Sequence, residues 1–231
     1  MSIAFSQDAT RRLPVYLLLD TSSSMQGVKI VGVNNGVVLI CQELMSDPRA
    51  ASTVSISVIT FADQAYQSPL TPIAQFVPPQ FPANSSLAPG TALGGALRLL
   101  NESLDQDIIT NQGGDRKGDY KPLVFVLTDG EPSDHWQTEA QRLATRTTNK
   151  VVNVIGLGIG PYANTNILRQ VATTTLLMQD VTPANIKAFF TWVSGSILTA
   201  SHAAMAYGQN MNQQQTQVAA PPMPSGLLPQ Q

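Results

Sequence analysis

The sequence predicts an α/β fold: a doubly wound, mostly parallel central sheet flanked by helices on both faces. From about residue 13 to about residue 203, apolar runs alternate with segments of helical periodicity. Two of these runs, residues 13–20 and 122–129, are apolar almost throughout, as expected of strands covered on both faces. Both end in an aspartate followed by a turn. This alternation of strands and helices is typical of parallel sheets with crossover helices.

The first half of the domain contains two strands and two helices. An apolar stripe that includes Val33 and Cys41 predicts the first helix, and Asp47-Pro48 ends it. The second strand alternates apolar and polar residues, which favours a position nearer the sheet edge. A loop with four prolines, residues 73–90, leads to Thr91. The predicted elements are strands at 13–20 and 52–61 and helices at 27–45 and 91–104.

The second half continues the pattern. Its predicted elements are strands at 122–129, 151–160 and 175–178 and helices at 134–148 and 183–198. Ser133 or Asp134 is placed to cap the helix over residues 134–148, because short polar side chains accept hydrogen bonds from the first helical N–H groups.

The chain length of 231 residues fits one domain with flexible ends. Residues 1–12 are predicted to be an N-terminal extension, and residues 13–203 form the domain. Residues 204–231 are rich in Gln, Pro and Met and lack apolar periodicity. Such a composition predicts a disordered tail.

The composition does not support several functional classes. The formal net charge is only −2 and no Lys/Arg cluster is present, so we expect neither nucleic acid nor a membrane as a partner. No signal-peptide pattern and no apolar stretch of bilayer-spanning length are apparent. One cysteine, Cys41, cannot form an internal disulfide. We therefore expect a cytoplasmic protein.

Oxygen-bearing side chains gather where the predicted strands end. Asp20 ends the first strand and Asp129 ends the strand over residues 122–129, so both acids can meet at the carboxyl edge of the sheet. Ser22 and Ser24 lie in the loop that follows Asp20, and Thr91 opens the helix after the proline-rich loop. Oxygen ligands without His or Cys suit a hard cation, Mg²⁺ first and Mn²⁺ or Ca²⁺ next. The five residues predict a metal site that captures an Asp or Glu of a protein partner.

Other interpretations of these residues remain open. "DTSSS" alone is equally compatible with helix capping. A Mg²⁺-dependent phosphohydrolase or transferase could use the same cluster, but no evident base or nucleophile accompanies it, so we expect no enzyme activity. An adaptor subunit of an AAA+ chelatase-type motor is a further alternative.

The segments "LLLDTSSSM", "APGTALGGAL" and "VFVLTDGEP" resemble the von Willebrand factor A domain and its metal-ion-dependent adhesion site (MIDAS). The resemblance implies a Rossmann-like α/β fold. It also implies that Ser22, Ser24 and Thr91 offer hydroxyls to the ion, while Asp20 and Asp129 bind it directly or through water. Ser23 stands where the family usually has Gly, which implies a slightly strained turn.

A narrower resemblance concerns the bacterial TerY type of A domain. It rests on "RRLPVYLLLDTSSSM", "VNNGV", "SVITFAD", "KGDYKPLVFVLTDGEPSDHW" and "KAFFTWVS". This group accompanies tellurium-resistance genes and often lies near genes for a protein kinase and a PP2C-type phosphatase. The resemblance implies a cytoplasmic adaptor in a stress-response system.

Overall fold

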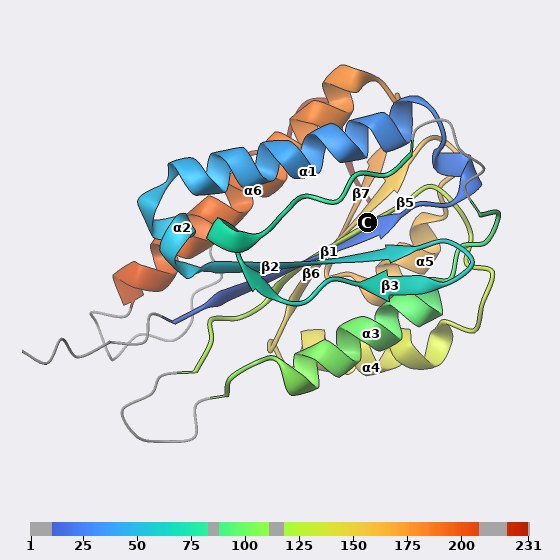
Figure 1. Ribbon diagram of the computed structural model, residues 1–231. Helices are drawn as coiled ribbons and strands as arrows, with labels where there is room; N and C mark the ends of the chain where they lie inside the picture. The colour runs from blue at the N-terminus through green and yellow to red at the C-terminus, as the bar shows by residue number, and fades with distance from the viewer. Residues whose placement is uncertain (1–10, 83–87, 111–117, 208–220, 231) are drawn as a thin grey trace, which may run out of the picture.

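The computed structural model describes residues 11–82, 88–110, 118–207 and 221–230 (Figure 1). Its strands are β1 Leu13–Asp20, β2 Val54–Phe61, β3 Ala65–Gln67, β4 Thr71–Pro72, β5 Leu123–Thr128, β6 Asn153–Ile159, β7 Thr174–Met178 and β8 Leu228–Gln230. Its α-helices are α1 Val28–Ser46, α2 Pro48–Thr53, α3 Leu93–Gln106, α4 Gln137–Thr148, α5 Thr165–Val171 and α6 Pro183–Tyr207, and short 3₁₀ turns span Ser23–Met25 and Ile73–Gln75.

One sheet organises the molecule. Its strand order is β3-β2-β1-β5-β6-β7-β8, with β4 also paired to β2. Strands β2, β1, β5, β6 and β7 run parallel, whereas β3, β4 and β8 pair antiparallel at the edges. The predicted α/β class with a mostly parallel sheet is therefore confirmed.

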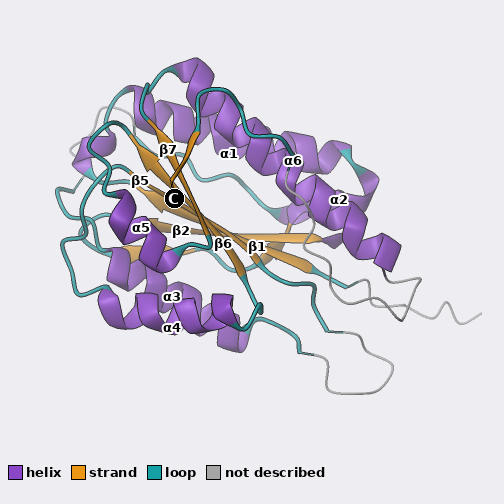
Figure 2. Cartoon of the chain, turned by 180° about the vertical axis from the view of Figure 1, so that it is seen from behind, coloured by secondary structure: helices purple, strands orange, loops and turns teal. Residues whose placement is uncertain are grey.

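Helices cover both faces of the sheet. Helices α1, α2 and α6 lie on one face and α3, α4 and α5 on the other, as Figures 1 and 2 show from opposite sides. Strand β1 is buried along its whole length, and its side chains alternate between the two cores. Val15 and Leu17 pack on the α1–α6 side, and Tyr16 and Leu18 pack on the α3–α4 side.

The segment between α1 and the end of β2 differs from the prediction. Asp47 was expected only to end a helix, but its carboxylate accepts hydrogen bonds from the N–H groups of Arg49 and Ala50. It thereby caps the short helix α2, and β2 starts at Val54, two residues later than predicted. The short strands β3 and β4, which both pair antiparallel with β2, were not predicted, because strands of three and two residues carry too little alternation.

The chain end also differs from the prediction. Helix α6 continues to Tyr207, and residues 221–230 pack on the domain although we predicted a disordered tail there. Strand β8 pairs with β7, Leu227 is buried, and the indole N–H of Trp192 donates to the Pro221 carbonyl. A composition poor in apolar residues did not reveal that Leu227 would be buried and that residues 228–230 would pair with β7. Residues 1–10, 208–220 and 231 of the predicted ends lie outside the described residues.

The sequence analysis found no apolar stretch of bilayer-spanning length, but helix α1 is one by length and composition. Among the described residues, it is the one helix long and apolar enough to cross a bilayer by length and composition. In this structure it packs against α6 and the sheet through residues such as Ile30, Val33 and Val37. Core helices of this kind pass the same test.

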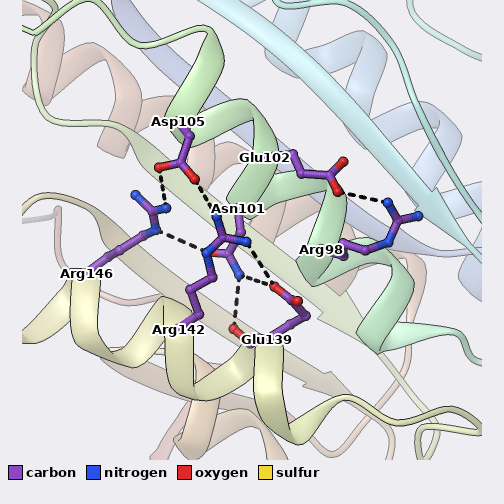
Figure 3. Close-up of polar contacts among 7 residues, drawn as sticks. All are labelled: Arg98, Asn101, Glu102, Asp105, Glu139, Arg142 and Arg146. Atoms are coloured by element: carbon purple, nitrogen blue, oxygen red, sulfur yellow. Dashed lines mark hydrogen bonds and ion pairs between the residues drawn. The ribbon is translucent and has the colours of Figure 1, made fainter.

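A polar network joins α3 and α4 (Figure 3). The Asp105 carboxylate accepts hydrogen bonds from both Arg142 and Arg146. The Asn101 amide donates to the Glu139 carboxylate at 2.9 Å, and its oxygen accepts from Arg146. These contacts fix two helices side by side, one of which begins next to Thr91.

Candidate metal site

Two strand ends bring the predicted carboxylates together. Strands β1 and β5 are parallel neighbours, with Leu19 level with Leu127. Asp20 is the last residue of β1, and Asp129 directly follows β5. Both side chains are largely removed from solvent, with residue exposures of 0% for Asp20 and 9% for Asp129. Burial is the main cause of the raised pKa of Asp20, and the charge of Asp129 adds a smaller contribution.

Asp20 is held by protein donors on both carboxylate oxygens. Oδ1 accepts from the Ser22 N–H at 2.8 Å, and Oδ2 accepts from the Thr128 hydroxyl at 2.5 Å. Burial raises the pKa of Asp20, and the hydrogen bonds from Ser22 and Thr128 partly offset that rise. Thr128 was not predicted as a site residue. Its position next to Asp20 follows from the register of β1 and β5, in which Leu127 lies opposite Leu19.

The predicted serines connect the two strand ends. The Ser22 and Ser24 hydroxyls share a hydrogen bond of 3.0 Å, and Ser24 Oγ donates to Asp129 Oδ1 at 2.6 Å. Ser22 is buried, whereas Ser24 is exposed. The cluster therefore opens to solvent on the Ser24 side. Ser23 has a negative φ, since Lys150 is the one non-glycine residue with positive φ in the described part of the chain. The strained turn implied at Ser23 is not seen.

Thr91 reaches the same place from a third segment. A β-carbon added to Gly130 would lie 3.3 Å from Thr91 Oγ1 and 3.9 Å from Ser24 Oγ. The two hydroxyls thus flank one point beside Gly130, directly after Asp129. The Thr91 N–H donates to the Ser133 hydroxyl at 2.8 Å, and the Ser133 N–H donates to the Thr91 carbonyl at 3.0 Å. These paired bonds fix Thr91 against the loop after β5.

Asp134 supports this arrangement in a way that the sequence analysis missed. It was expected, with Ser133, to cap the helix beginning near residue 134. Instead its carboxylate accepts hydrogen bonds at 2.9 Å from the N–H groups of Gly94 and Gly95, at the start of α3. A β-carbon on Gly94 would approach the His135 carbonyl oxygen to 2.5 Å, so only glycine permits this contact. The capping prediction for helix α4 is wrong, because Asp134 caps a neighbouring helix.

Lys29 is a second residue that the sequence analysis missed. Gly27 precedes α1 with a φ of +76°, a conformation that glycine adopts readily. Lys29 follows in the first turn of α1, and its ammonium group forms an ion pair with Asp129 Oδ2. It also donates to the Ser24 carbonyl at 3.1 Å. The signal available in the sequence was its position five residues after Ser24.

The donor set fits a hard divalent cation. The described residues contain no group of three or more His, Cys, Asp and Glu side chains that could hold a metal. A metal site built here depends instead on hydroxyl oxygens together with two carboxylates, a chemistry that favours Mg²⁺, Mn²⁺ or Ca²⁺. The structure brings all five predicted side chains to one sheet edge, and their role as ligands stays a prediction.

Comparisons with known proteins point to one family. The family model of the von Willebrand factor type A (VWA) domain matches residues 15–190. No curated protein matches the sequence. Similar folds are found in proximal thread matrix protein 1 of the mussel byssus with a zinc-occupied MIDAS motif (20% identity, 80% of this chain and 48% of that chain, TM-score 0.54) and in a von Willebrand factor type A protein from Catenulispora acidiphila (16%, 82% and 43%, 0.58).

A third similar structure is the pilus adhesin SpaC from Lactobacillus rhamnosus GG, in its open conformation (14% identity, 83% of this chain and 30% of that chain, TM-score 0.61). The chain thus spans about half the length, or less, of these structures, and identities this low support the fold alone. The family model covers most of the domain, including every residue of the proposed site. The chain belongs to the von Willebrand factor type A domain family.

Proposed function

We propose that this protein is a metal-dependent protein-interaction module. VWA domains are often modules of this kind, using a MIDAS metal. The proposal rests on one observation: Asp20 and Asp129 end neighbouring strands, and the hydroxyls of Ser22, Ser24 and Thr91 converge beside them. Mg²⁺ is the proposed ion, because oxygen ligands with only two carboxylates suit it.

Each part of the cluster has its own task. Asp20 is locked by Ser22 and Thr128, so its carboxylate keeps a fixed orientation without an external ligand. Ser24 lies at the solvent side, where an approaching side chain can reach the cluster. When bound, a divalent cation supplies positive charge for a carboxylate oxygen of the partner. The chain itself therefore holds the ion, and the partner supplies the remaining anionic ligand.

The experiment is a metal-dependent capture assay. Immobilised protein is exposed to cell extract with Mg²⁺ or with EDTA, and captured proteins are identified and then retested in purified form. We expect at least one purified partner to bind with Mg²⁺, to be released by EDTA and to bind neither Asp20→Ala nor Asp129→Ala. Circular dichroism confirms that the variants fold. Equal binding of the purified partner by wild type and folded variants would contradict the proposal.

We further propose a cytoplasmic role in a tellurium-resistance or stress-response system, with a protein kinase and a PP2C-type phosphatase as partners. Only the TerY-like sequence segments support this assignment. Co-purification of the tagged protein from its native cells tests it directly. Recovery of a kinase or phosphatase supports the assignment, and consistent recovery of an AAA+ subunit favours the motor-adaptor alternative.

The site is proposed to be non-enzymatic. Its hydrogen bonds, in the described part of the chain, involve no His or Cys side chain that could serve as base or nucleophile. Mg²⁺-dependent hydrolysis of a phosphoester, abolished by Asp20→Ala, would contradict this.

A further inference from the structure

The proposed site contains a positively charged side chain, that of Lys29. Lys29 pairs with Asp129 Oδ2, while the other oxygen of Asp129 accepts from Ser24. Both Asp129 oxygens are therefore engaged inside the protein. The Asp129 side chain is only 2% exposed, whereas that of Lys29 is 25% exposed. The lysine thus reaches into the site from its solvent side.

This ion pair has an electrostatic reason. A buried carboxylate without a partner is costly, because the protein interior replaces its hydration poorly. Asp20 is satisfied by an N–H and a hydroxyl, neither of which carries charge. Asp129 has one hydroxyl donor and therefore depends on Lys29 for charge compensation.

We propose that Lys29 is a built-in competitor of the divalent cation at this site, an inference that rests on the proposed function. The Lys29 ammonium group occupies the Asp129 oxygen that faces away from Ser24. A divalent ion at the five-residue cluster and the ammonium group of Lys29 repel each other at this range. Lys29 must then withdraw toward solvent, which its long, partly exposed side chain permits.

The competition sets the metal concentration at which the protein becomes competent to bind a partner. The apparent dissociation constant for the metal equals the intrinsic constant divided by the fraction of time that Asp129 is free of Lys29. The metal-free protein is stabilised by the same contact. Removal of the lysine charge therefore has two linked effects: tighter metal binding and a less stable metal-free fold.

Two variants separate charge from hydrogen bonding. Lys29→Met removes both the charge and the hydrogen-bond donor. Lys29→Gln removes the charge but retains an N–H group that can donate to Asp129. The Gln variant should therefore fold even if the Met variant does not. Lys187→Gln is the matched control, because Lys187 is an exposed lysine on α6 and, among the described residues, no hydrogen bond or ion pair joins it to Asp20, Asp129 or the site hydroxyls. Mg²⁺ and Mn²⁺ binding to each purified full chain is measured by titration calorimetry, and thermal unfolding is followed in EDTA.

We expect Lys29→Met and Lys29→Gln to bind both ions about tenfold more tightly than wild type, in proportion to the competition removed. Their melting temperatures in EDTA should fall, most for Lys29→Met, and should approach that of wild type at saturating Mg²⁺. Lys187→Gln should match wild type in both measurements.

The results distinguish two failures. Suppose that wild type binds the metal and that the folded Lys29 variants bind it with the same or lower affinity. That result would overturn the competitor role of Lys29 but would leave the metal site itself supported. If neither wild type nor the Lys29 variants bind either ion, both this inference and the proposed function are wrong.

Discussion

The carboxyl edge of the sheet and the polar network between α3 and α4 use the same chemistry at very different depths. At the sheet edge, Asp129 is buried and contacts Lys29 and a serine hydroxyl. On the α3–α4 side, Asp105 is 46% exposed and contacts Arg142 and Arg146 (Figure 3). Solvent screens the ion pairs of Asp105, so they contribute little to stability. Asp129 is buried and must obtain its charge compensation from protein groups.

The difference extends to the acids themselves. Burial raises the pKa of Asp20, whereas the hydrogen bond and charge of Arg146 lower the pKa of Asp105. Keeping the buried Asp20 carboxylate charged costs free energy, which is unfavourable for a residue that only supports the fold. Asp105 carries no such cost, and it serves to align two helices. On the strength of this comparison we propose the sheet edge, and not the α3–α4 network, as the functional region.

The largest effect should come from Asp129→Ala. This change removes one of two carboxylates and the acceptor of Ser24, so we expect Mg²⁺ affinity to fall more than about 100-fold. Titration calorimetry measures it, and Asp105→Ala is the matched control with unchanged affinity. Comparable losses in the two variants would remove the distinction between the two regions.

Asp134→Ala should have an intermediate effect. It removes the acceptor for two N–H groups at the start of α3, which costs about 1 kcal/mol of unfolding free energy. Because α3 begins beside Thr91, metal affinity should also fall, roughly tenfold. Urea unfolding and calorimetry measure both quantities.

Asp47→Ala is the control for that variant, since Asp47 caps α2 in the same manner. We expect it to lose similar stability and to keep full metal affinity. An unaltered affinity in Asp134→Ala would show that the cap does not support the site.

In metal-stripped protein at acid pH, Asp20 and Asp105 should change the free energy of unfolding with pH in opposite directions. The raised pKa of Asp20 means that the folded state holds its proton longer than the unfolded state, so stability falls as pH rises from about 3.8 through the raised value. The lowered pKa of Asp105 has the reverse effect: stability is present above about 3.8 and is lost as pH falls through the folded value. Denaturant unfolding across this pH range measures both.

The variants Asp20→Asn and Asp105→Asn assign the two slopes. Asp20→Asn should make stability fall less as pH rises, and Asp105→Asn should make it rise less. The same change of slope in both variants would contradict the pKa assignments.

The smallest effect should come from Asp105→Asn at neutral pH. Its exposed ion pairs contribute at most about 1 kcal/mol, and salt should reduce that further. Urea unfolding at low and high salt measures this. A loss of several kcal/mol would mean that the α3–α4 network matters far more than its exposure indicates.

Much of the fold follows from local patterns in the sequence. The apolar runs at residues 13–20 and 122–129 predicted β1 and β5 because strands buried on both faces need apolar side chains throughout. The two aspartates at their ends predicted that Asp20 and Asp129 would meet. The domain limits at residues 12 and 203 stay predictions.

What the sequence did not reveal depends on contacts between distant segments. Asp134 lies next to one helix and caps another, so local spacing misassigned it. Strand β8 forms because Leu227 finds a buried position and β7 has a free edge, neither of which composition records. Lys29 carried no motif of its own, and its contact with Asp129 joins the first turn of α1 to the end of β5, 100 residues away in the sequence.

The most direct test is a crystal structure of the protein grown with Mn²⁺, whose anomalous signal locates the ion. The account predicts one strong site surrounded by Asp20, Ser22, Ser24, Thr91 and Asp129, with Lys29 turned away from Asp129. An ion bound elsewhere, or no ion at this edge at saturating Mn²⁺, would contradict it.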